Sequence, residues 1–120
     1  MIILVEDDSL QAKLLCHLLK NNDIDILHFE TGKDLINFVL KENNLEIKLI
    51  IIDCFLPDYS GDQIIQILND NELKLRTCIF SANDCDKLKS KVKDLGAIDF
   101  FVKGKTNEIK RLIKLIKSNH

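Results

Sequence analysis

The sequence predicts an α/β fold, a doubly wound parallel sheet of five strands with five helices. Short apolar runs alternate along the 120 residues with segments whose apolar side chains recur at helical spacing. The run 49–52 is wholly apolar and mostly β-branched, which indicates a strand buried on both faces of a parallel sheet. A regular alternation of strand and helix favours parallel strands covered by helices on both sides.

The individual elements follow in order from these patterns. The predicted strands are the apolar segments 2–5, 24–29, 49–53, 77–80 and 98–102. A helix is expected after each strand, and Gly96 is expected to end the fourth helix. The apolar faces of the five helices carry Leu14, Leu15, Leu18 and Leu19; Leu35, Ile36, Val39 and Leu40; Ile64, Ile65 and Leu68; Leu88, Val92 and Leu95; and Ile109, Leu112, Ile113 and Ile116.

Composition narrows the class of protein further. The content of 46% hydrophobic and 30% charged residues is typical of one globular domain, expected to span 1–120 and to end with its last helix. The net charge of -2 argues against direct binding of nucleic acid. No segment has the length of a transmembrane helix, and the apolar start lacks a basic leader, so no membrane partner is expected. Four cysteines without metal-site spacing indicate free thiols in a cytoplasmic compartment.

Polar residues follow four of the five predicted strands, at the point where each strand ends. The first strand runs into Glu6, Asp7 and Asp8, and the other three groups are Asp53, Ser81 and Lys103. Because the carboxyl ends of parallel strands share one edge of the sheet, where ligands bind, these groups are expected to converge. Singly, such residues are usually solvated loops, helix caps or surface charges. Their joint occurrence at four strand ends favours a functional site.

The predicted convergence has a definite chemistry. Carboxylates from two strands would repel each other unless a cation joined them, and Mg²⁺ binds one or two carboxylates while sharing a phosphate. The ammonium of Lys103 and the hydroxyl of Ser81 suit a phosphoryl group. Asp53 is then a candidate nucleophile, since a carboxylate can form an acyl phosphate.

The whole chain resembles the receiver domains of two-component response regulators. The likeness rests on the acidic residues after the first strand, on the segment 53–61 with its Asp-x-x-Leu-Pro-x-x-x-Gly pattern, on 81–82, and on 95–97 with 100–103. It implies a flavodoxin-like strand order 2-1-3-4-5. It also implies that a sensor histidine kinase or phosphotransfer protein phosphorylates Asp53, and that the domain catalyses its own phosphorylation and dephosphorylation.

The resemblance assigns roles to individual residues. Glu6 and Asp7 match the acidic pair of the family, and Asp8 is expected to cap the first helix, for which Ser9 is a second possible cap. The direct Mg²⁺ ligands would be Asp7, Asp53 and the backbone carbonyl of Phe55, with Glu6 acting mainly through water.

Further roles concern switching and the rate of hydrolysis. Ser81 matches the switch hydroxyl, Phe100 the switch aromatic and Lys103 the phosphate-binding lysine. Phe55 and Asn83 would flank the path of attacking water and tune the rate. Phe55 could instead only cover the core, and both interpretations stay open. Phe100 is expected to be mobile or outward without phosphate and buried when a phosphate mimic is bound.

One residue departs from the family pattern. The family usually follows its lysine with a proline, often after a cis bond, whereas Gly104 follows Lys103 here. A cis bond without proline costs about 2.5–4 kcal/mol. We therefore expect a trans bond, with Gly104 in a conformation that other residues avoid.

The resemblance also implies partners. Output would pass to a downstream protein or to an output domain of the same protein, through the fourth helix, fifth strand and fifth helix, and a phosphorylation-dependent homodimer is open. One alternative is a receiver-like interaction module that works without phosphorylation. Another is a nucleotide- or flavin-binding protein, but no glycine-rich phosphate loop follows the first strand.

Overall fold

The computed structural model describes residues 1–41 and 46–118, and within these ranges strands and helices alternate without exception. The elements are β1 (Ile2–Val5), α1 (Ser9–Lys20), β2 (Ile26–Phe29), α2 (Gly32–Lys41), β3 (Leu49–Asp53), α3 (Gly61–Asp70), β4 (Thr77–Ser81), α4 (Asp86–Asp94), β5 (Asp99–Val102) and α5 (Thr106–Lys117).

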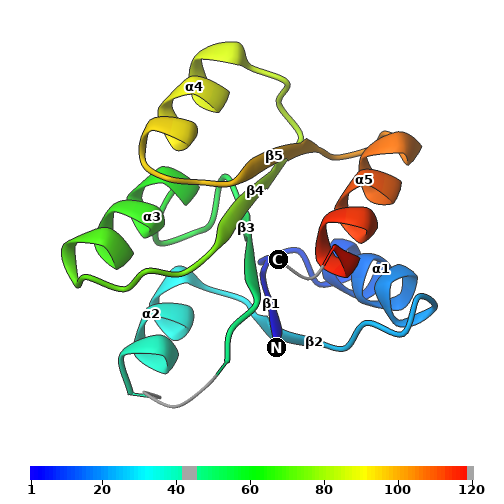
Figure 1. Cartoon of the computed structure of the whole chain (residues 1–120), viewed down its shortest axis with the longest axis horizontal. Helices are drawn as coiled ribbons and strands as arrows, with labels where there is room; N and C mark the ends of the chain where they lie inside the picture. Colours follow the sequence, from blue (N-terminus) through cyan, green and yellow to red (C-terminus); the bar gives the residue numbers. More distant parts are fainter. Residues whose placement is uncertain (42–45, 119–120) are drawn as a thin grey trace.

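All neighbouring strands are parallel, and their order in the sheet is β2-β1-β3-β4-β5. The doubly wound fold and its strand order are therefore confirmed. Helices α1 and α5 cover one face of the sheet, and α2, α3 and α4 cover the other (Figure 1). Each face of the sheet has its own apolar core, and the central strand β3 contributes to both. Ile50 and Ile52 pack under α2 and α3, and Leu49 and Ile51 pack on the other face, under α1 and α5.

Helix α1 begins directly after the acidic residues that follow β1. The side chain of Asp8 accepts hydrogen bonds from the backbone N–H groups of Leu10 (3.0 Å) and Gln11 (3.1 Å). This confirms the predicted cap, which satisfies N–H groups that have no partner inside the helix. The cap fixes the first turn of α1 beside the carboxyl edge of the sheet.

The predicted start of the second strand was two residues too early. The backbone N–H of Ile24 donates to the carbonyl of Leu19 at 3.0 Å, and Asp23 has a φ of 61°. These residues form the turn that ends α1, so pairing with β1 begins only at Ile26. A left-handed aspartate is uncommon, and for that reason the apolar pattern alone did not reveal the turn.

Gly61 holds the start of α3 close to the end of β3. Its N–H donates to the carbonyl of Cys54 at 2.8 Å, and a Cβ atom here would lie 2.8 Å from Ile79 Cδ1 and 3.4 Å from Cys54 Cα. Glycine permits this close approach. The loop between Asp53 and α3 is thereby tied to the strand end. Within the described residues, no helix is both long and apolar enough to cross a membrane.

Candidate functional site

Three carboxylates meet at the carboxyl edge of the sheet. Glu6 and Asp7 follow β1, Asp53 ends β3, and one oxygen from each lies within 4.8 Å of the others. Glu6 is only 4% exposed and Asp53 only 8%, whereas Asp7 faces solvent. Because acidic groups so close and so buried repel one another, this arrangement attracts cations.

Lys103 brings one cation to the cluster from the end of β5. Its Nζ lies 2.6 Å from Glu6 Oε1 and 3.2 Å from Asp53 Oδ1. Burial opposes the charge on Lys103, but the bond to Glu6 and the charge of Asp53 outweigh it and raise the pKa of Lys103. Burial, followed by the neighbouring Asp53 carboxyl group, raises the pKa of Glu6, and Lys103 offsets only part of this effect. Because the cluster has three carboxyl groups and only one ammonium, it retains a net negative charge.

Ser81 ends β4 at the same edge and is fully buried. Its hydroxyl oxygen accepts the backbone N–H of Asn83 at 3.1 Å, and its carbonyl accepts the N–H of Lys103 at 2.7 Å. The second bond joins the ends of β4 and β5, so the backbone positions that carry the hydroxyl and the ammonium side chains are held side by side. Asn83 itself is exposed.

The predictions for the segment after Lys103 are confirmed. The Lys103–Gly104 peptide bond is trans, and Gly104 has a φ of 84°, which other residues rarely adopt. A Cβ atom on Gly104 would meet nothing within 4 Å, so the conformation and not crowding explains the glycine.

Phe55 follows Asp53 by two residues and is 62% exposed. Its ring therefore does not cover the core, which removes that interpretation. The segment is held by a bridge between Phe55 and Ser60 and by a hydrogen bond from the N–H of Leu56 to the carbonyl of Tyr59 at 3.1 Å. The loop thus presents an apolar ring to solvent beside the acidic cluster.

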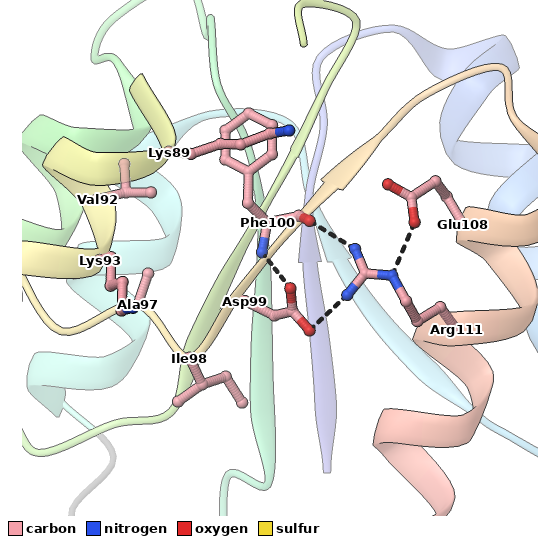
Figure 2. A pocket seen from close by; sticks show the side chains of 9 residues that line it. All are labelled: Lys89, Val92, Lys93, Ala97, Ile98, Asp99, Phe100, Glu108 and Arg111. Atoms are coloured by element: carbon pink, nitrogen blue, oxygen red, sulfur yellow. Dashed lines mark hydrogen bonds and ion pairs between the residues drawn. The ribbon is translucent and has the colours of Figure 1, made fainter. Parts of the chain in front are cut away.

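Of the two states expected for Phe100 without phosphate, mobile or outward, the outward position is wrong for this structure. Phe100 is only 8% exposed and belongs to the core cluster that includes Val92 and Ala97. Its ring lies at the wall of a cavity of about 340 Å³ between α4 and α5, with Lys89 Nζ 5.7 Å from its centroid (Figure 2). The physical reason is packing, because β5 directs this side chain toward α4, where an apolar ring leaves water without help from a phosphoryl group.

β5 is an edge strand of the described sheet, and Arg111 lies along its outer edge. It donates to Phe100 O at 2.7 Å, to Asp99 Oδ2 at 2.7 Å and to Glu108 Oε2 at 2.8 Å (Figure 2). The other oxygen of Glu108 accepts the N–H of Val102 at 3.2 Å. Side chains of β5 and α5 thus satisfy backbone groups that an edge strand would otherwise leave open to pairing. We call Asp99, Glu108 and Arg111 the strand clamp.

Two residues contact the site without having been predicted. Gln11 Oε1 on α1 accepts a hydrogen bond from Lys103 Nζ at 2.8 Å, and His28 Nε2 on β2 donates to the carbonyl of Glu6 at 2.7 Å. The only sequence signal for Gln11 is its place in the first turn of the helix that begins at the acidic pair. No local pattern distinguishes His28 from other polar residues in strands.

An edge of a parallel sheet that gathers three carboxylates, an ammonium and a buried hydroxyl defines a class of domain suited to a metal ion and an anionic group. The family model of the response regulator receiver domain matches residues 2–117, so the chain belongs to this family. The chain is accordingly a signal-transduction domain of the two-component type.

The chain is also similar to individual proteins and solved structures. A cyclic di-GMP phosphodiesterase from Thermotoga maritima is 27% identical over 114 residues, covering 92% of this chain but only 29% of that protein. The Francisella response regulator 1452 receiver domain superposes with a TM-score of 0.85 at 23% identity, covering 98% of this chain and 93% of the other. A signal receiver domain of a Luxo repressor-type protein from Vibrio parahaemolyticus gives 0.81 at 31% identity, with 98% and 92% covered.

Proposed function

We propose that the domain accepts a phosphoryl group on Asp53 in a Mg²⁺-dependent reaction. The observation that carries this proposal is the position of Asp53, 3.2 Å from Lys103 and within 4.8 Å of Glu6 and Asp7. A nucleophilic carboxylate is useful for phosphoryl transfer only where the charge of the incoming phosphate is neutralised. The ammonium supplies part of that neutralisation.

The carboxylates fit a magnesium ion by their chemistry. All three offer oxygen, which is the ligand that Mg²⁺ prefers, and the charge left by one ammonium among three carboxyl groups is of the right sign. Asp7, Asp53 and the backbone carbonyl of Phe55 would hold the ion directly, with Glu6 acting mainly through water. When bound, Mg²⁺ neutralises charge on both the carboxylates and the phosphoryl oxygens.

The residues of this chain then have separate tasks. A carboxylate oxygen of Asp53 attacks phosphorus, an acyl phosphate bond forms, and the phosphorus–nitrogen bond of the donor phosphohistidine breaks, its imidazole leaving with a proton from water. Lys103 would bind a phosphoryl oxygen as a point charge. Ser81 would donate a hydrogen bond from its hydroxyl to another phosphoryl oxygen, because its contact with the N–H of Asn83 engages the hydroxyl oxygen only as an acceptor. Phe55 would limit the access of water to the product, and Asn83 would share this role.

Switching is proposed in a revised form. Phe100 already packs against α4 and is buried. Movement of Ser81 would therefore change the packing behind this ring and would not bring the ring in from solvent. The output partner would be a downstream protein or an attached output domain meeting α4, β5 and α5, and a phosphorylation-dependent homodimer is a further option. The family implies a sensor histidine kinase or phosphotransfer protein as donor and a cytoplasmic location.

Intact mass spectrometry tests the proposal. With acetyl phosphate and Mg²⁺, the wild-type chain should gain one phosphoryl group that hydroxylamine removes, and Asp53→Asn should gain none. The matched control is Asp86→Asn, whose carboxylate is fully exposed and is not among the residues assigned to the site, and it should be labelled like wild type. Equal labelling of Asp53→Asn would remove Asp53 from this role. No labelling of any variant would favour an interaction module that works without phosphorylation.

A further inference from the structure

Lys103 lacks the rigid neighbour that a proline would provide. Gly104 follows it with a φ of 84° and open space where a Cβ atom would lie, so the chain beyond the lysine does little to direct it. The lysine side chain has four rotatable bonds and loses considerable freedom when it is held in one place. Contacts at its ammonium must therefore determine where it lies.

That ammonium has three oxygen partners of two kinds, and it also lies 5.9 Å from the centroid of the Phe80 ring. Glu6 and Asp53 are carboxylates at 2.6 and 3.2 Å. Under the proposed function, both become involved with the metal ion and the phosphoryl group, so their contacts with Lys103 change during the reaction. Gln11 is the third partner, at 2.8 Å, and it is a neutral amide that has no place among the proposed metal ligands.

The backbone of Gln11 is well anchored, while its side chain is exposed. Its backbone N–H donates to Asp8 Oδ1 at 3.1 Å within the cap of α1, and α1 packs against the sheet through Ala12, Leu15 and Leu19. The amide oxygen therefore has a fixed origin on a different element from the lysine, 92 residues away in sequence.

We propose that Gln11 is the positioning residue for Lys103. Its amide oxygen keeps the ammonium beside Asp53 when the carboxylates are engaged elsewhere, and so replaces the restraint that proline gives in other members of the family. The inference rests on the proposed function, because the position of Lys103 matters for accepting a phosphoryl group.

A double-mutant cycle on the labelling rate tests this role. Gln11→Leu should slow labelling by acetyl phosphate about tenfold, the size expected for loss of one hydrogen bond to a charged group. In the Lys103→Met background the same change should have no further effect, since Gln11 acts only through the lysine. Lys13→Leu, a substitution of an exposed residue on the same helix, should be labelled like wild type. Equal slowing by Gln11→Leu in both backgrounds, or no slowing in the wild type, would overturn the inference.

A second measurement does not depend on labelling. In ¹⁵N NMR spectra of the folded chain, a held lysine ammonium exchanges its protons slowly enough to be seen. The Lys103 signal should persist with Mg²⁺ and beryllofluoride in the wild type and in Lys13→Leu, and should disappear in Gln11→Leu. A Lys103 signal that survives in Gln11→Leu would contradict the proposal. Failure of the wild type to label would count against the proposed function, whereas this signal would still decide the role of Gln11.

Discussion

Two cations lie next to strand β5, one at its carboxyl end and one along its outer edge, and they have different roles. At its carboxyl end, Lys103 faces the buried carboxyl groups of Glu6 and Asp53, whose side chains are 6% and 11% exposed. At its outer edge, Arg111 faces Asp99 and Glu108, which are 31% and 18% exposed. Lys103 is a point charge in a cluster that keeps negative charge to spare, whereas Arg111 uses its planar fork to make directed bonds.

The difference shows that a cation paired with an aspartate and a glutamate can serve binding in one place and structure in another. Charges at the outer edge are partly hydrated, so the strand clamp gains mainly through the backbone groups that it satisfies. In the acidic cluster, Glu6 and Asp53 are shielded from water while Asp7 faces solvent, and the three carboxylates repel one another, so the cluster is unfavourable until a further cation arrives. The strand clamp therefore stabilises the fold, whereas the acidic cluster contains electrostatic repulsion that a bound cation would reduce.

The largest predicted effect on stability comes from breaking the strand clamp. Arg111→Ala removes hydrogen bonds to Asp99, to Glu108 and to the carbonyl of Phe100, and we expect the free energy of unfolding to fall by about 2 kcal/mol. Urea denaturation measures the change. Magnesium affinity should stay at the wild-type value, and a parallel loss of that affinity would show that the two regions are not separate.

Neutralising the nucleophile should raise the free energy of unfolding instead of lowering it. Asp53→Asn removes one of three mutually repelling carboxyl groups while Lys103 keeps its bond to Glu6, so the metal-free domain should become more stable by about 1 kcal/mol. The same denaturation experiment without Mg²⁺ tests this. A destabilised Asp53→Asn would mean that the pair with Lys103 outweighs the repulsion, contrary to our description of the cluster.

A smaller effect is expected from pH. The hydrogen bond from Arg111 is the main reason why the pKa of Glu108 lies below its ordinary value of 4.5. A carboxyl group with a lowered pKa stabilises the fold above its ordinary range, and that contribution disappears as pH falls through the folded-state pKa. Glu108→Gln should therefore be less stable than wild type at pH 7, by less than about 1 kcal/mol, and the difference should disappear as pH falls through the folded-state pKa of Glu108. A difference that persists in acid would assign the effect to packing.

Most of the fold followed from the sequence because its signals are local. The β-branched run that ends at Asp53 and the helical spacing around Leu112 and Ile116 identify their elements without any long-range information. The convergence of Glu6, Asp7, Asp53 and Lys103 also followed, since the carboxyl ends of parallel strands share an edge.

The remaining features depend on contacts between distant segments. The bond between Gln11 and Lys103 spans 92 residues, and that between His28 and Glu6 joins two strands through a side chain, so no periodicity reveals either. The inward ring of Phe100 depends on how α4 packs over β5, which alternation along the strand does not specify. These are properties of tertiary packing and not of segment type.

Calorimetric titration with Mg²⁺ tests the central claim, that the spare negative charge of the acidic cluster is a metal site. The wild-type chain should bind one ion, Asp7→Asn should bind at least tenfold more weakly, and Asp99→Asn, which removes a carboxylate of similar type from the strand clamp, should match wild type. Equal affinity for wild type and Asp7→Asn, or a loss in Asp99→Asn as large as in Asp7→Asn, would contradict the account.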